Sequence, residues 1–256
     1  LYACGNKVFK TTNEGHSWDA ISPDLTRADP KTMGVSGPLT MDTAGAEMYA
    51  TIFSFMASKH RPGVLMAGSD DGLVHVSMND GKTWKNVTPK GMKKWSQVTM
   101  LAESEHKKGT VYMSVARHKE GDYAPYIYKT TDWGKTWKKI TRGLPSDDFV
   151  RVVREDPNRA GLLYAGTELG LYGSFDDGAN WQSLQANLPI CPVYDLIIKD
   201  TDMVVATHGR SFWILDDVTQ LHQIYDDLGK EKKYLFAPRD TVRAPDHLFA
   251  GFWGSL

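Results

Sequence analysis

Apolar and polar residues alternate along most of the chain with the two-residue period of β-strands. Short runs such as "GTVYMSV" and "GLLYAGT" are rich in β-branched and aromatic residues and are bounded by Gly, Asp or Asn. Successive side chains of a strand point to opposite faces, so this pattern predicts short antiparallel strands joined by tight turns. The sequence therefore predicts an all-β protein.

One short motif, [ST]-x-[DN]-x-G-x-[STN]-W, occurs four times, and its copies are spaced 66, 53 and 44 residues apart. The Asp or Asn oxygen can accept hydrogen bonds from backbone N–H groups of the same turn, and Gly supplies the positive φ that completes it. The Trp opens the next strand and is expected to bury a large flat surface while its indole N–H finds a partner. We call this the turn motif; its residues are Asn13, Gly15, Trp18, Asn79, Gly81, Trp84, Asp132, Gly134, Trp137, Asp176, Gly178 and Trp181.

The strands around each motif form a repeating unit of four antiparallel strands, named a to d in chain order, with the turn motif between c and d. Residues 147–188 show this unit in full, and a fifth unit has Asp216 and Asp217 at the turn but no Gly-x-x-Trp after them. Four-stranded units of roughly 40 to 50 residues in series predict a β-propeller. A solenoid and a sandwich are the alternatives. About four and a half blades are visible, and we expect further blades or another chain to close a ring of seven or more.

The propeller blades are predicted over residues 1–219, and residues 220–256 are predicted to connect them to a further domain. Within this connector, residues 225–233 are expected to form a loop or helical turn, and "YLFAP" (residues 234–238) a strand. An insertion at residues 36–58 begins Gly-rich, where we expect it to cross the ligand-binding face, and ends in "YATIFSFMAS", which we predict to be a strand a.

Composition narrows the classes of ligand. The chain has 30 basic and 31 acidic side chains and a formal net charge of −1, so no overall field favours nucleic acid or an anionic membrane. No run approaches the roughly 18 apolar residues that a membrane-spanning helix needs. Cys4 and Cys191 form no C-x-x-C pair and are expected to be ordinary small buried residues. We expect no metal site and no cofactor.

The four motifs resemble the Asp-box, or BNR, repeats of sialidases, sortilin-type propellers and two-propeller xyloglucanases. The runs "GVLMAGSDDGLVHVSMNDGKTWKNVTP" and "VVATHGRSFWILDD" resemble a narrower group of large exported bacterial proteins, labelled glycosyl hydrolase with BNR repeats or sortilin N-terminal-like. The resemblance covers about residues 1 to 220. It implies a longer parent protein that is secreted, periplasmic or on the cell surface, whose leader is not visible in this chain. It implies no particular activity.

Strand direction predicts where ligands would bind. Because neighbouring strands run in opposite directions, the turn motifs lie at one face, and the b–c turns lie at the other, where propellers usually bind ligands. Turn-motif residues are therefore expected to be scaffold. The ligand-rim candidates are Arg117, His118, Asp122, His208 and Arg210, and Asp70, Asp71 and Glu168 are weaker candidates for a catalytic carboxylate pair.

These residues suggest two main functions. The leading hypothesis is a binding platform that recognises a protein or a glycan through this rim. The alternative is a glycoside hydrolase whose two carboxylates lie on the same rim. Sialidase activity is disfavoured, because it needs three arginines around a carboxylate and only Arg117 and Arg210 lie on the rim. A third possibility is a structural piece of a larger assembly.

Overall fold

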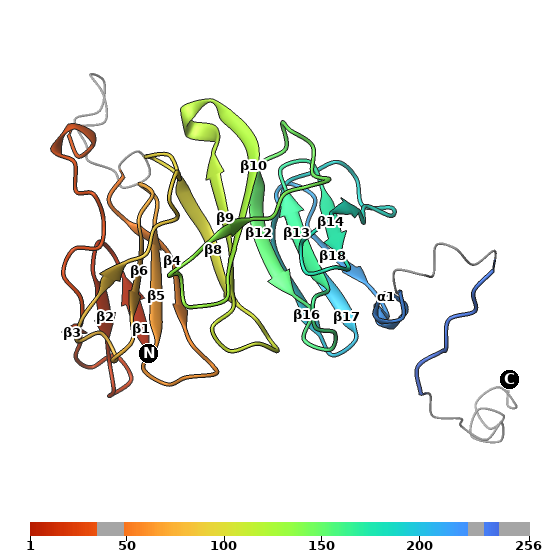
Figure 1. Cartoon of the computed structure of the whole chain (residues 1–256), viewed down its shortest axis with the longest axis horizontal. Helices are drawn as coiled ribbons and strands as arrows, with labels where there is room; N and C mark the ends of the chain where they lie inside the picture. The colour runs from red at the N-terminus through yellow and green to blue at the C-terminus, as the bar shows by residue number, and fades with distance from the viewer. Residues whose placement is uncertain (35–48, 225–232, 241–256) are drawn as a thin grey trace, which may run out of the picture.

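The computed structural model describes residues 1–34, 49–224 and 233–240. Five antiparallel sheets stand side by side as an open fan, with the first and last sheets at opposite ends (Figure 1). Three sheets have four strands and the two outer ones have three. In chain order the sheets contain β1 (Tyr2–Cys4), β2 (Val8–Lys10) and β3 (Asp19–Ala20); β4 (Ile52–Ala57), β5 (Leu65–Ser69), β6 (Val74–Ser77) and β7 (Lys85–Asn86); β8 (Gln97–Glu103), β9 (Val111–Arg117), β10 (Asp122–Thr130) and β11 (Lys138–Lys139); β12 (Val150–Glu155), β13 (Leu163–Thr167), β14 (Leu171–Ser174) and β15 (Gln182–Ser183); and β16 (Val193–Lys199), β17 (Asp202–Thr207) and β18 (Phe212–Leu215).

This arrangement confirms the predicted all-β fold of four-stranded antiparallel units. The first sheet lacks strand a and the fifth lacks strand d, so the described strands amount to the four and a half blades that were expected. The described helices are short: η1 (Pro30–Thr32), η2 (His118–Glu120) and α1 (Thr219–His222). The cores lie between sheets, where apolar side chains of neighbouring units meet.

The predictions for the insertion at residues 36–58 and for the connector at residues 220–256 are confirmed in one part and wrong in another. The strand predicted in "YATIFSFMAS" is confirmed as β4, whereas residues 35–48 lie outside the described residues. The strand predicted in "YLFAP" is wrong, because the backbone of Ala237 is hydrogen-bonded to the side-chain amide of Gln223 and no strand pairs with this segment among the described residues. Most of the predicted loop at residues 225–233 also lies outside them. Helix α1 was not predicted and lies across the expected boundary at residue 219.

Each turn motif is closed by hydrogen bonds within the turn. In the third sheet, Asp132 Oδ1 accepts from the backbone N–H of Thr136 at 2.9 Å, and the hydroxyl of Thr130 accepts from the N–H of Gly134 at 2.9 Å. Gly134 has φ +85°, a conformation that other residues adopt only with strain. The corresponding bonds recur in the other three motifs.

The tryptophan of the motif bonds to a different sheet from its own. The indole N–H donates to a backbone carbonyl just after strand d of the preceding sheet, at 2.7 to 2.9 Å; the pairs are Trp84–Ile21, Trp137–Val87 and Trp181–Ile140. The same receiving residue approaches the motif glycine so closely that a Cβ on Gly178 would lie 2.4 Å from Ile140 Cδ1. The turn motif therefore joins neighbouring sheets as well as closing its own hairpin.

The first sheet shows what happens without a neighbour on that side. Trp18 is 42% exposed, so the expectation that every motif tryptophan is buried is wrong there, because no described sheet precedes the first. Cys4 is also exposed, since β1 is the free edge strand of that sheet, whereas Cys191 is buried as expected.

A second set of links joins the a–b turns of successive sheets. A ring or amide nitrogen of one turn contacts a backbone carbonyl of the next sheet at 2.8 to 3.1 Å; the pairs are His60–Ser104, His106–Asp156 and Asn158–Asp200. Beside them, Glu103 accepts from the hydroxyl of Ser58, and Glu155 accepts from the hydroxyl of Ser104. These contacts recur from sheet to sheet and keep the fan in register.

Replacing Trp181 by Ala should lower the free energy of unfolding by about 3 to 5 kcal/mol, because a nearly fully buried ring and its hydrogen bond are lost. Trp18→Ala is the matched control and should cost only about 0.5 kcal/mol, since its ring is largely exposed. Urea titration followed by circular dichroism measures both. Equal losses in the two variants would contradict the cross-sheet role of the motif.

Candidate functional site

The turn motifs and the b–c turns lie at opposite ends of the sheets. Motif residues bond directly to the a–b turns of their own sheets, as Asp80 N does to Gly63 O at 2.7 Å and Asp177 N does to Gly161 O at 2.8 Å. In an antiparallel unit the a–b and c–d turns share one end, so the b–c turns and the d–a connections occupy the other. This second end, which we call the rim, carries the predicted ligand residues.

Strand a carries an extra residue near the rim in four sheets. The register between strands a and b shifts by one at the same place each time, so that one residue of strand a has no partner opposite; these residues are Phe53, Thr99, Arg151 and Tyr194. Such bulges re-aim a side chain. The a strands of neighbouring sheets lie against one another, so these four positions line the inner side of the fan.

Six residues of the third, fourth and fifth sheets form one connected group, the rim cluster: His118, Phe149, Arg151, Glu168, Tyr194 and His208. The His118 ring stacks on Phe149, with centroids 4.7 Å apart and planes 16° apart. The Arg151 guanidinium lies 4.0 Å from the ring centroid of Tyr194 and 4.9 Å from that of Phe149. These distances are typical of aromatic stacking and cation–π contact.

Two further contacts extend the rim cluster. Arg151 Nε donates to Glu168 Oε2 at 2.6 Å, which fixes the guanidinium between the two aromatic rings. Tyr194 also contacts the His208 ring, with centroids 5.2 Å apart. Tyr194 is 48% exposed while Phe149 is buried, so the cluster has a rigid base and an accessible surface.

Charge and burial act together on His118. Burial lowers the pKa of its imidazole, the nearby positive charges of Arg151 and Lys119 lower it further, and Glu168 opposes them. His118 Nδ1 is buried and has no hydrogen-bond partner in the described structure. The lowered pKa keeps the ring neutral at neutral pH, as its buried and unpartnered Nδ1 requires.

Asp70 and Asp71 are buried, being 5% and 0% exposed. Asp71 accepts from the hydroxyl of Ser69 at 2.5 Å and from the backbone N–H of Arg27 at 2.7 Å. Asp70 accepts from the N–H of Thr51 at 2.9 Å, and burial raises its pKa, with the charge of Asp71 acting in the same direction. Both carboxylates therefore order the backbone around the b–c turn of the second sheet.

Arg117 and Asp122 form a separate group. Asp122 accepts from Lys93 Nζ at 2.7 Å and from the Tyr126 hydroxyl at 2.9 Å, and Arg117 Nε lies 3.3 Å from the same carboxylate. Burial raises the pKa of Asp122, but the hydrogen bonds from Lys93 and Tyr126 outweigh it and bring the pKa to about 2. Arg210 is exposed, and its backbone carbonyl accepts from the indole of Trp213.

The structure thus places three predicted residues, His118, Glu168 and His208, in the rim cluster. Three other members of the cluster, Phe149, Arg151 and Tyr194, were missed by sequence reasoning, which searched the b–c turns alone. The sequence did contain a signal for two of them. Arg151 in "FVRV" and Tyr194 in "VYDL" are large polar or aromatic residues at the second position of their strand a, at the rim end.

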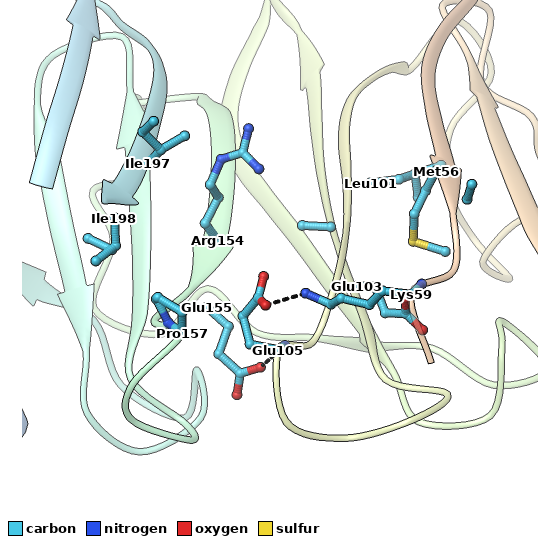
Figure 2. Close-up of a pocket in the computed structure, with 12 residues that line it drawn as sticks. Met56, Lys59, Leu101, Glu103, Glu105, Arg154, Glu155, Pro157, Ile197 and Ile198 are labelled. Carbon is cyan, nitrogen blue, oxygen red and sulfur yellow. Dashed lines mark hydrogen bonds and ion pairs between the residues drawn. The ribbon is translucent and has the colours of Figure 1, made fainter. Parts of the chain in front are cut away.

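A cavity of about 440 Å³ lies on the inner side of the fan at the end near the a–b turns (Figure 2). Its apolar lining comes from both sides, with Met56 and Leu101 on one side and Ile197 and Ile198 on the other (Figure 2). The charged lining residues are Lys59, Glu103, Glu105, Arg154 and Glu155. Figure 2 shows Lys59 directed toward Glu105, with which it forms an ion pair. The charged groups of this cavity are thus largely engaged in the links between sheets.

The described part of the chain has neither a metal-binding cluster nor a membrane-spanning helix. No group of three or more His, Cys, Asp or Glu side chains is arranged to hold a metal ion there. No helix in the same residues has the length and apolar character needed to span a membrane.

No protein-family model and no curated protein sequence matches the chain. The fold is similar to solved structures. One is the GH74 xyloglucanase from Xanthomonas campestris, with a TM-score of 0.61 and 15% identity over 85% of this chain and 34% of that one. The extracellular domain of a hybrid two-component system from B. thetaiotaomicron matches at 0.54, with 17% identity over 84% of this chain and 25% of that one. YCF48 bound to a D1 peptide matches at 0.52, with 16% identity over 84% and 59%.

These similarities agree with the sheet topology, and together they define the class: the described residues form blades of a β-propeller. The chain spans about a third of the length of the xyloglucanase. At such low identity the likeness extends to the fold alone, since one fold supports many functions.

The titration of His118 tests the electrostatics of the rim cluster. NMR of the imidazole should show a pKa below the ordinary value of about 6.5. Arg151→Met should raise this pKa, because a nearby positive charge is removed, whereas Arg154→Met, on the same strand but paired with Asp195, should leave it unchanged. Since the folded state binds this proton less tightly than the unfolded chain, the His118 contribution to stability should decline as pH falls below about 6.5. An unshifted His118, or equal effects of both variants, would contradict the assignment.

Proposed function

We propose that this protein is an exported β-propeller that binds a protein or glycan ligand through the rim opposite the turn motifs. The observation that carries the proposal is the rim cluster, in which Arg151 lies between the rings of Phe149 and Tyr194. Aromatic faces and a fixed guanidinium are the groups that dominate binding energy at recognition surfaces. The ion pair with Glu168 orders Arg151 before a ligand arrives, so little side-chain entropy is lost on binding.

The resemblance to Asp-box, or BNR, repeat proteins and to the sortilin N-terminal-like group supports this proposal. Within it, residues 1–219 are blades and residues 220–256 are a connector, and remaining blades or another chain complete the ring. On the same resemblance we propose that the protein acts outside the cytoplasm, as a secreted, periplasmic or cell-surface protein. A protein ligand is also in keeping with the similar structure that is described as YCF48 bound to a D1 peptide.

A glycoside hydrolase is the second candidate, and one observation favours it. Burial raises the pKa of Asp70, and the charge of the neighbouring Asp71 acts in the same direction, as expected for a carboxyl group that could serve as a general acid. Against it, Asp71 and Glu168 are already engaged by Arg27 and Arg151. Turnover of fluorogenic glycosides that is lost in Asp70→Asn would favour the hydrolase over a platform that only binds.

The platform can be tested with glycan and peptide arrays probed with the purified protein. Tyr194→Ala should weaken binding of the ligands so found by roughly tenfold or more, because an exposed aromatic anchor is removed. Ile197→Ala is the matched control, since Ile197 lies on the same strand with a similar exposure of 46% but lines the inner-side cavity instead. It should leave binding unchanged. Weaker binding by Ile197→Ala with unchanged binding by Tyr194→Ala would indicate that the ligand binds in the cavity. Unchanged binding by both variants would contradict a binding site on this part of the rim.

A further inference from the structure

Among the described residues, the fifth sheet ends at an unpaired edge strand, β18. In the three complete sheets, strand d pairs with strand c through two residue pairs, and in the second sheet these are His75–Asn86 and Val76–Lys85. The register of the fifth sheet places Trp213 and Ile214 at the positions of His75 and Val76. No described strand lies beside them on the outer side.

The backbone of β18 presents its hydrogen-bonding groups to this free edge. The N–H of Thr207 bonds to the carbonyl of Ser211 at 3.2 Å, so the Ser211 carbonyl faces β17. Backbone groups of consecutive strand residues point to opposite sides, so those of Phe212 and Ile214 point outward. In the second sheet the residue equivalent to Phe212 is Val74, whose carbonyl accepts from Val87 N at 2.8 Å.

The four strands that do occupy this position share one sequence pattern, Trp-x-x-aliphatic. The segments are residues 18–21, 84–87, 137–140 and 181–184. In each, the aliphatic residue donates its N–H to a carbonyl of strand c at 2.8 to 2.9 Å; the pairs are Ile21–Val8, Val87–Val74, Ile140–Ile127 and Leu184–Leu171. A fourth strand for the fifth sheet would therefore be a short extended segment of this pattern, with its aliphatic N–H bonded to the carbonyl of Phe212.

The residues that follow β18 are bound elsewhere. Asp217 N donates to Asp202 Oδ1 at 2.9 Å, and Val218 N donates to Thr201 O at 2.7 Å. Helix α1 then contacts the fourth sheet, where His222 lies 3.0 Å from the Asp156 carboxylate. These bonds turn the chain away from the edge at the point where the other units enter their turn motif, so residues 216–224 cannot supply the strand.

The edge is also apolar. Phe212 is 75% exposed, Ile214 61% and Leu215 36%, and β18 carries no charged residue and no proline. Exposed edges are normally protected by charge, proline or a covering segment, because unpaired strands associate with other chains. The equivalents of Phe212 and Ile214 in the second sheet, Val74 and Val76, belong to a core shared with the third sheet, so their exposure here reflects the lack of a described sheet after the fifth. Among the described residues β18 is the one strand c without a strand d beside it, and this unpaired backbone makes it a strand-acceptor site.

We propose that β18 accepts a fourth strand from a partner polypeptide, supplied as an extended Trp-x-x-aliphatic segment. The added strand would pair with β18 as strand d pairs with strand c in the other four sheets. This edge is a different surface from the rim cluster. The inference therefore stands whether or not the rim binds ligand. Main-chain hydrogen bonds to Phe212 and Ile214 supply the pairing, and the aliphatic side chain covers apolar surface of the fifth sheet.

The probe is the peptide GKTWKKIT, which is the strand d segment of the third sheet at residues 134–141. Its matched control is GKTWKKPT, in which proline removes the N–H expected to bond to Phe212. Titrated into the isotope-labelled full chain, the first peptide should give saturable amide shifts at residues 212–215. It should also slow exchange of the Ile214 amide by roughly tenfold. The second peptide should do neither. Because a free octapeptide binds an edge weakly, each peptide is also fused through a Gly/Ser linker to the end of the full chain, which raises its effective concentration.

Ile214→Pro provides the reciprocal variant, since it removes the outward N–H from the acceptor strand and proline is tolerated on edge strands. Binding of GKTWKKIT should be lost, with the near-ultraviolet spectrum of the folded chain retained; if the variant unfolds, the two peptides still decide. Equal responses to both peptides, or no protection of Ile214 even in the fusion, would overturn the proposal. An Ile214 amide already protected in the chain alone would also overturn it, because the strand would then come from this polypeptide.

Discussion

The hydrogen bond from each motif tryptophan to the preceding sheet is the interaction on which the fan depends. A four-stranded sheet cannot bury both of its faces alone, so each sheet needs a neighbour held at a fixed distance and angle. The indole supplies a large apolar surface and one directional bond, and the motif glycine lets the two backbones approach closely. Because the glycine that closes the hairpin also contacts the receiving residue, one turn sets both the local and the inter-sheet geometry.

The two ends of the sheets therefore differ in role: one end holds neighbouring sheets together, and the other carries the candidate ligand-binding residues. At the end with the turn motifs, polar groups are engaged in hydrogen bonds: the Asp or Asn oxygen of each motif accepts from backbone N–H groups, and the His60 and His106 rings contact the next sheet. At the rim, the bulge in strand a leaves one residue without a partner in each of four sheets, while the pairing below it continues. Residues such as Arg151 and Tyr194 can therefore vary in chemistry while the scaffold is kept.

Much of this fold could be predicted from sequence because its signals are local. The turn motif and the two-residue alternation lie within a few residues of one another, and they predicted the strands, their order and the face on which each turn lies. The inter-sheet role of the tryptophan could not be predicted, because its acceptors lie 41 to 63 residues earlier and belong to another sheet. Asp70 and Asp71 were predicted as candidate carboxylates of the rim, and their burial could not be predicted, because the distant Arg27 binds the backbone and carboxylate of Asp71. The rim cluster was half predicted, since a bulge leaves no mark in the pattern until the register is known.

Indole hydrogen exchange tests the central claim most directly. The cross-sheet account predicts that the Nε1–H groups of Trp84, Trp137 and Trp181 exchange slowly with solvent, because each is bonded to a carbonyl of the preceding sheet. Trp18, which is largely exposed and has no preceding sheet in the described structure, should exchange rapidly. Exchange at one common rate for all four indoles would contradict the account.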